Sequence, residues 1–272
     1  MGMPERRRSL VVPREHGAWG ILLVPLTVGA WAGLVDGGSL ARVVPLIVAA
    51  LALFWMRTPL ESWAGASPIK ARTADEFALV RRALWVLGAV AAAGLIGVFW
   101  GGERLGLFLV GAAAGAAFAA QWVVKRAWRR ARTAAQIIGS AGLTATAPAA
   151  YYAATGHFAV TAWQLWAASF AFAANQIHFV QVRVHAAKAT TRRAKMAAGW
   201  VFFAGQSAMV VMLIAVCALR LFPWGGSLAF VPILIRGFAW FATPGDALVI
   251  RELGKSELAF AIGFGLLLGL LV

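Results

Sequence analysis

The chain has 272 residues, of which 61% are hydrophobic and 13% are charged, and its formal net charge at pH 7 is +15. This composition excludes a soluble domain and predicts an all-α integral membrane protein. The single cysteine, Cys217, excludes an internal disulfide and a cysteine metal cluster. The lysines and arginines are spread over many of the loops between apolar runs and are not gathered in one segment or domain. No nucleic-acid partner is therefore expected.

Apolar runs predict a cytoplasmic segment at 1–16 and a single transmembrane domain over 17–272. About 18 to 20 apolar residues cross the hydrocarbon core as a helix. Counted this way, the chain forms a polytopic bundle of about nine transmembrane helices. The expected spans are 17–35, 40–57, 83–100, 105–124, 134–154, 160–182, 197–219, 227–243 and 256–272. The second and the eighth are the weakest, because each is short or interrupted.

The opening stretch VVPREHGAWGILLVP puts three polar residues directly before the first span. Arg14 and Glu15 are expected on the cytoplasmic face. His16 is followed by two small residues, which let other helices approach closely, so its imidazole is a candidate ligand-binding group. The alternative is that His16 caps the start of the helix and anchors it at the interface together with Trp19.

Two prolines are expected to interrupt the spans. Pro59 should end the second span and leave Arg57 and Glu61 at the membrane surface, before the longest cytoplasmic loop. These two side chains are predicted either to form an interfacial ion pair or to bind a ligand. Pro148 lies in the polar fifth span and should kink it.

The cytoplasmic end of the sixth span, AANQIHFVQVRVHAAK, is the most polar stretch within a span. A strongly polar side chain in a span usually faces the bundle interior or a water-filled cavity. The stretch therefore predicts a cytoplasm-facing cavity suited to an anionic headgroup or to proton transfer, with simple contacts between helices as the alternative. A rotation of about 100° per residue places Asn175, His178, Gln181 and His185 on one face, and Gln176 and Arg183 on another.

Metal binding by this stretch is not expected. His178 and His185 are seven residues apart, about 10 Å along the helix axis, which is too far for both to ligate one ion.

Arg236, in VPILIRGFAW, is the least expected charge within a span. It lies between Pro232 and Gly237, in a helix that should be kinked. An intramembrane arginine needs an acceptor. Either backbone carbonyls satisfy it structurally, or it lines a pocket that binds an anion.

The distribution of basic residues predicts the orientation, because short cytoplasmic loops hold most of the lysines and arginines. With nine spans, one side of the membrane receives nearly all of the 25 cations. The other side receives only Arg42, Arg104 and Arg220. The N-terminus is therefore expected in the cytoplasm and the C-terminus outside it.

The motif PREHGAW, followed by an apolar helix, resembles the start of the YwiC-like family of bacterial membrane proteins. The resemblance runs through most of the chain and implies a location in the bacterial inner membrane. It implies no particular reaction.

A more distant resemblance is to the UbiA superfamily of intramembrane prenyltransferases. REHGAWGILLVPLTVGAWAG is similar to its first helix, and NQIHFVQVRVHAAKATTRRAKMAAGW stands where its second aspartate-rich motif lies. The stretches KRAWRRARTAAQIIGSAGLTATAPAAYYAATG and RELGKSELAF are similar to two of its connections. This resemblance implies a UbiA-like bundle of nine helices, a cavity open to the cytoplasm and an isoprenoid-like substrate.

The chain departs from that superfamily where magnesium would bind. The superfamily holds magnesium and a diphosphate with aspartates at the inner ends of its second and sixth helices. Here the second helix offers Arg57 and Glu61, and the sixth offers His178, Gln181 and His185. In the neighbouring register it offers Gln176, Phe179 and Arg183. No aspartate motif is present, so no Mg²⁺ and no other cofactor is predicted.

The favoured functional hypothesis is a cavity that binds an anionic or isoprenoid-like amphipathic ligand. Its acidic group would be held by Arg57, Arg183, Arg236 and Arg14 through charge-assisted hydrogen bonds. If the protein is a divergent transferase, His178 is the candidate acid or base. The expected partners are membrane lipids. The alternatives are a carrier for a small solute or lipid, and an accessory membrane protein without catalytic activity.

Overall fold

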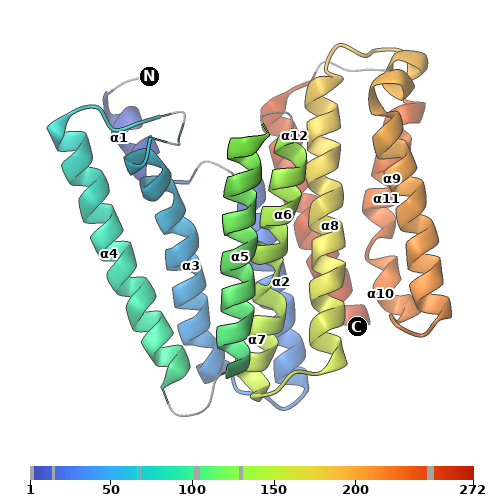
Figure 1. The fold of residues 1–272 in the computed structure, drawn as a ribbon. Coiled ribbons are helices and arrows are strands. Elements are labelled where there is room, and N and C mark those ends of the chain that lie inside the picture. Colours follow the sequence, from blue (N-terminus) through green and yellow to red (C-terminus); the bar gives the residue numbers. More distant parts are fainter. Residues whose placement is uncertain are drawn as a thin grey trace.

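The computed structural model describes residues 3–13, 16–65, 67, 69–100, 105–128, 131–243 and 248–272, and every regular element in these ranges is a helix. Figure 1 shows most helices running side by side along the length of the bundle. In chain order the helices are α1 (Met3–Val11), α2 (His16–Val35), α3 (Leu40–Trp63), α4 (Ala74–Phe99), α5 (Leu105–Ala127), α6 (Arg132–Thr144), α7 (Thr146–Thr155), α8 (Val160–His185), α9 (Arg192–Ala218), α10 (Trp224–Leu228), α11 (Val231–Ala242) and α12 (Ile250–Leu271).

The membrane character of the chain is confirmed, and the predicted count of nine spans is approximate. Within the described residues, 7 helical segments are long and apolar enough to cross a membrane. Two predicted spans are not among them. The range 134–154 is divided between α6 and α7, and the range 160–182 lies in α8, which has 26 residues but more polar side chains.

The prediction that Pro59 ends the second span is wrong. The helix α3 continues through Pro59 to Trp63. A proline inside a helix removes only one backbone hydrogen bond, and here an ion pair spans the proline, with Arg57 Nε 3.0 Å from Glu61 Oε1. The helix therefore extends beyond the predicted edge of the membrane.

The predicted fifth span is divided at Ala145, three residues before Pro148, where a kink was predicted. The helix α6 ends at Thr144, and α7 begins at Thr146. Pro148 has no N–H to donate to the carbonyl of Thr144, so one bond of the helical ladder is missing across this point. The hydroxyl of Thr146 donates to the carbonyl of Leu143 at 2.8 Å and closes the break locally.

Glycines let α2 pack closely against α7 at the centre of the bundle. A Cβ atom added to Gly29 would collide with the carbonyl oxygen of Ala147, and one added to Gly33 would lie 2.7 Å from the Cβ of Ala154. Small residues allow such close helix contacts in membranes. On another face, α2 packs against α12, where Gly20 meets Ala261.

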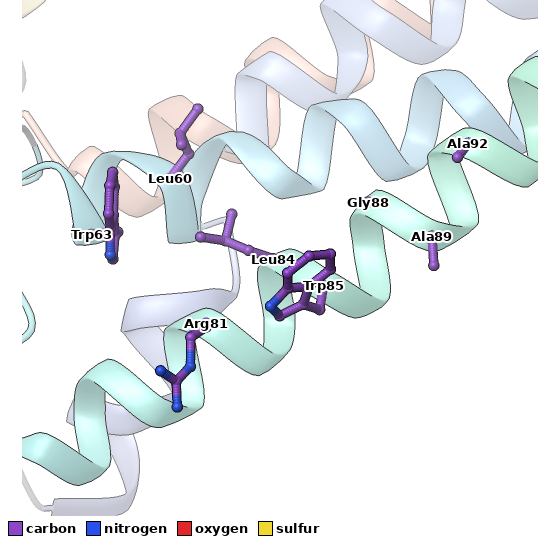
Figure 2. Close-up of a pocket in the computed structure, with 8 residues that line it drawn as sticks. All are labelled: Leu60, Trp63, Arg81, Leu84, Trp85, Gly88, Ala89 and Ala92. Atoms are coloured by element: carbon purple, nitrogen blue, oxygen red, sulfur yellow. The ribbon is translucent and has the colours of Figure 1, made fainter.

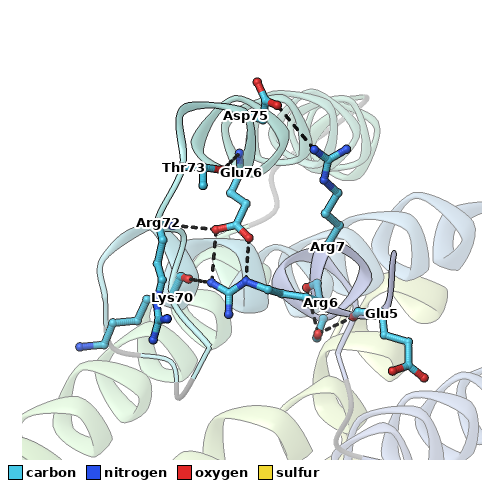
Figure 3. A network of polar contacts seen from close by, with 9 residues as sticks. Glu5, Arg6, Arg7, Lys70, Arg72, Thr73, Asp75 and Glu76 are labelled. Carbon is cyan, nitrogen blue, oxygen red and sulfur yellow. Dashed lines mark hydrogen bonds and ion pairs between the residues drawn. The ribbon is translucent and has the colours of Figure 1, made fainter. Parts of the chain in front are cut away.

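The segment 1–16, expected only as a cytoplasmic stretch, contains the helix α1, which is fastened to α3 and α4. Figure 3 shows Arg6 reaching Glu76, with Arg6 Nε 2.7 Å from Glu76 Oε1. The backbone N–H of Arg72 donates to the same carboxylate at 2.8 Å. The indole of Trp55 donates to the carbonyl of Val11 at 2.8 Å, and Leu10 is fully buried. These contacts dock α1 on one end of the bundle.

Glu76→Ala is expected to release α1. It removes a charge-assisted hydrogen bond of about 1.5–3 kcal/mol, so trypsin should cleave after Arg8 roughly tenfold faster as the helix opens locally. Limited proteolysis of the purified protein, followed by mass spectrometry, measures this rate. Asp75→Ala is the matched control, because the Asp75 side chain is 82% exposed and lies 3.5 Å from Arg7. Equal cleavage of the two variants would contradict the docking contact.

Candidate functional site

An ion pair is buried between α11 and α12. Nη1 of Arg236 lies 2.6 Å from Oε1 of Glu257, and the two side chains are only 12% and 5% exposed. Arg236 stands six residues before the end of α11, about 9 Å below that end at a rise of 1.5 Å per residue. A charge at this depth is costly and usually marks a functional site.

Aromatic rings and an amide hold the pair in place. The Cζ atom of Arg236 lies 4.2 Å from the ring centre of Phe179 on α8 and 4.3 Å from that of Phe260 on α12. These distances allow cation–π contacts on the guanidinium. The amide of Gln176, also on α8, donates to the backbone carbonyl of Glu257 at 3.1 Å. Three helices therefore fix the orientation of one guanidinium.

Polar atoms around this pair remain without a partner. Among the described residues, nothing accepts a hydrogen bond from Nε or Nη2 of Arg236, and nothing bonds Oε2 of Glu257 or either amide atom of Gln206. Gln206, on α9, is 1% exposed and lies against Gly237, the neighbour of Arg236. A buried polar group without a hydrogen bond costs about 1–3 kcal/mol. We call Arg236, Glu257, Gln176, Gln206, Phe179 and Phe260 the Arg236 cluster.

Charge around the pair is positive. Arg183, predicted as an anion-binding residue, lies with its Cζ 5.8 Å from the ring centre of Phe179, on which Arg236 also stacks. Two guanidinium groups and one carboxylate leave a net positive charge, which favours the binding of an anionic ligand.

The N-terminal end of α9 holds the C-terminal end of α11. The ammonium of Lys195, which is buried, donates to the carbonyls of Trp240 at 3.0 Å and Thr243 at 2.9 Å. Arg192 donates to the carbonyl of Ala242 at 2.8 Å. Cations are favourable near the negative end of a helix. These bonds fix α11, and with it Arg236, against α9.

The other predicted residues of α8 point to different neighbours. Asn175 donates to the sulfur of Met209 on α9 at 3.8 Å, and the ring of His178 stands edge-on to Phe202, also on α9. Gln181 instead donates to Gln136 on α6 at 3.0 Å. His185 lies 2.7 Å from the carbonyl of Gln181 in its own helix. The four residues were expected to share one face of the helix. In the structure, Asn175 and His178 contact α9, whereas Gln181 contacts α6.

The remaining predicted residues lie elsewhere or outside the described residues. Arg57 and Glu61 pair with each other on α3, which packs mainly against α4 and α7. Arg14 falls outside the described residues. His16 is the first residue of α2 and stands one turn before Gly20, where α2 meets α12.

Comparison with known proteins identifies the family. The sequence model of the YwiC-like protein family matches residues 12–151, slightly more than half of the chain. The chain belongs to the YwiC-like protein family. Its motif PREHGAW falls inside the matched range. No curated protein and no solved structure matches the chain. The resemblance to the UbiA superfamily therefore stays a prediction.

The Arg236 cluster of this YwiC-like protein lies outside the matched range. The match runs from the residues before α2 into α7, and the cluster is built by α8, α9, α11 and α12. The two parts meet where α2 packs against α8 and α12. The family match thus establishes membership, and the cluster is a property of the second half of the chain.

Two polar residues of the Arg236 cluster, and its aromatic rings, were not predicted as site residues from the sequence. Glu257 stands at the start of the last predicted span. A carboxylate at such a position needs a cationic partner, so it could have been predicted to pair with an arginine. Gln206 is an amide in the middle of the seventh predicted span. A polar side chain at that depth could also have been predicted to face the interior of the bundle. In the described part of the chain, no group of three or more His, Cys, Asp or Glu could hold a metal ion. The prediction that no cofactor binds stays a prediction.

Proposed function

We propose that this YwiC-like membrane protein binds an amphipathic anion, whose acidic group is held by Arg236. The observation that supports this proposal is the guanidinium fixed between two aromatic rings, with Nε and Nη2 unpartnered among the described residues. An arginine presents its N–H groups in a rigid fork that matches carboxylate and phosphate oxygens. The site would therefore accept an acidic headgroup, and the apolar body of the ligand would lie among the helices.

The neighbours of Arg236 complete the chemistry of binding. Arg183, beside the ring of Phe179, adds a second positive charge, and the unpartnered amide of Gln206, beside Gly237, is a further buried donor. Glu257 holds Arg236 by one nitrogen only, which fixes the guanidinium without occupying its other N–H groups. The assignment of His178 as an acid or base in a reaction stays a prediction.

The proposed setting is the bacterial inner membrane, with the N-terminus in the cytoplasm. The bias of the basic residues toward one side supports this orientation. It places the Arg236 cluster nearer the cytoplasmic face, because α11 ends and α12 begins on that side. An anionic ligand would then enter from the cytoplasmic leaflet or from the cytoplasm.

Titration with dodecyl phosphate tests the proposal. Native mass spectrometry of the purified protein should show one bound molecule, and Arg236→Gln should weaken binding about ten- to hundredfold, as expected for the loss of charged hydrogen bonds of 1.5–3 kcal/mol. Arg57→Gln is the matched control, because Arg57 pairs with Glu61 on a distant helix. Equal binding by the wild type and Arg236→Gln would contradict the proposal.

A carrier is the second candidate function, and the interrupted helices favour it. The α6–α7 and α10–α11 segments are each broken within the bundle, and discontinuous helices are typical of transporters. Proteoliposomes that contain unlabelled dodecyl phosphate would then take up labelled dodecyl phosphate by counterflow. Binding without counterflow would favour a binding site over a carrier.

A further inference from the structure

A groove separate from the Arg236 cluster lies between α3 and α4. Its volume is about 580 Å³. Figure 2 shows Leu84 and Trp85 following Arg81 along α4, with Leu60 and Trp63 near the end of α3. The groove is lined by Leu60, Trp63, Arg81, Leu84, Trp85, Gly88, Ala89 and Ala92.

The groove exists because α3 and α4 touch closely at one end and not at the other. A Cβ atom added to Gly94 would lie 2.7 Å from the backbone nitrogen of Ala49, so the two backbones are nearly in contact there. Six residues earlier, a Cβ atom at Gly88 would meet nothing within 4 Å. The absence of a side chain at Gly88 therefore leaves the middle of the groove open.

The length of the groove matches one leaflet of a membrane. The twelve residues from Arg81 to Ala92 span about 16 Å along the helix, close to half of a hydrocarbon core of about 30 Å. The side chains that line the groove along this length are apolar, except for Arg81 at the end near α1. Trp63 and Trp85 are 57% and 75% exposed beside Arg81, as expected for residues at a membrane interface.

Arg81 is available to an anion. It is exposed, and it forms no ion pair with any residue that the structure describes. The one carboxylate of α3 is that of Glu61, and its Oε1 lies 3.0 Å from Nε of Arg57, so its charge is already neutralised. A cation at the membrane surface above an apolar groove complements the phosphate and the acyl chain of an anionic phospholipid.

We propose that this groove binds one anionic phospholipid from the leaflet on the α1 side. Its phosphate lies on the guanidinium of Arg81, and one acyl chain follows Leu84, Gly88 and Ala92 into the membrane. The lipid fills the opening between α3 and α4 and fastens the weakly covered helix α4 to the bundle. This site uses no residue of the Arg236 cluster, so it does not depend on the proposed function.

Native mass spectrometry tests the site with dioleoyl phosphatidylglycerol and dioleoyl phosphatidylcholine as probes. The wild type should retain one phosphatidylglycerol, bound at least tenfold more tightly than phosphatidylcholine. Arg81→Ala should remove this preference. Gly88→Phe should weaken both lipids at least tenfold, because the ring occupies the path of the acyl chain.

Two matched variants serve as controls. Arg82→Ala removes the neighbouring cation, which does not line the groove, and Gly111→Phe adds the same ring on α5 at a glycine that also has open space around it. Both should bind lipid like the wild type. The proposal is overturned if Gly88→Phe and Gly111→Phe bind lipid with equal affinity, or if Arg82→Ala loses the preference for phosphatidylglycerol as fully as Arg81→Ala. It is also overturned if a second copy of the chain covers the groove in a lipid-free dimer.

Discussion

Arg236→Leu alone is expected to lower the free energy of unfolding by about 3–5 kcal/mol. The substitution leaves the carboxylate of Glu257, whose side chain is 5% exposed, buried without its partner. Glu257→Leu alone should cost a similar amount, because it leaves the guanidinium unpaired. Reversible unfolding of the purified protein in mixed micelles of dodecyl maltoside and SDS measures both values.

The double variant separates the ion pair from the two isolated charges. Arg236→Leu combined with Glu257→Leu should recover most of the lost stability, because apolar side chains often replace a buried ion pair without net cost. Arg57→Leu should change the stability by no more than about 1 kcal/mol, since the pair with Glu61 is partly exposed. A single variant at Arg236 as stable as the wild type would contradict the buried pair.

Gly29→Ala is expected to destabilise the protein by about 1–3 kcal/mol, the usual cost of overpacking. A Cβ atom at this position would collide with the backbone of α7 at Ala147, and a backbone cannot move aside as a flexible side chain can. The expected sign is opposite to the gain of roughly 1 kcal/mol that alanine gives over glycine in an open helix. The same unfolding experiment measures the change.

Gly111→Ala is the control for this prediction. Gly111 is also within a long helix, α5, but a Cβ atom there would meet nothing within 4 Å. This variant should be as stable as the wild type or slightly more stable. Equal effects at the two glycines would mean that α2 and α7 are not packed as closely as described.

Much of the fold could be predicted because long apolar runs determine where helices cross a membrane. The break near Pro148 was predictable, since proline has no N–H to continue the helical ladder. The effect of Pro59 was not, because a helix can continue past a proline where side chains such as Arg57 and Glu61 pair across it. The helix α1 was missed, because a short polar stretch such as MPERRRSLV carries no apolar periodicity, and its stability comes from docking through Arg6 and Leu10.

The candidate site was only partly predictable, because a sequence does not reveal how helices are rotated against one another. The unusual depth of Arg236 drew attention to it, but its partner Glu257 is on another helix, and no local spacing connects the two. The polar end of α8 was recognised from its composition. Which of its side chains face α12, α9 or α6 depends on packing that the pattern of Gln176, His178 and Gln181 alone does not determine.

Titration of dodecyl phosphate into the double variant, Arg236→Leu with Glu257→Leu, tests most directly whether Arg236 binds the acidic group of the ligand. This variant should fold with nearly the stability of the wild type, because both buried charges are removed together. Native mass spectrometry should nevertheless show binding at least tenfold weaker than that of the wild type. A folded double variant that binds dodecyl phosphate as tightly as the wild type would show that Arg236 is not the group that holds the anion.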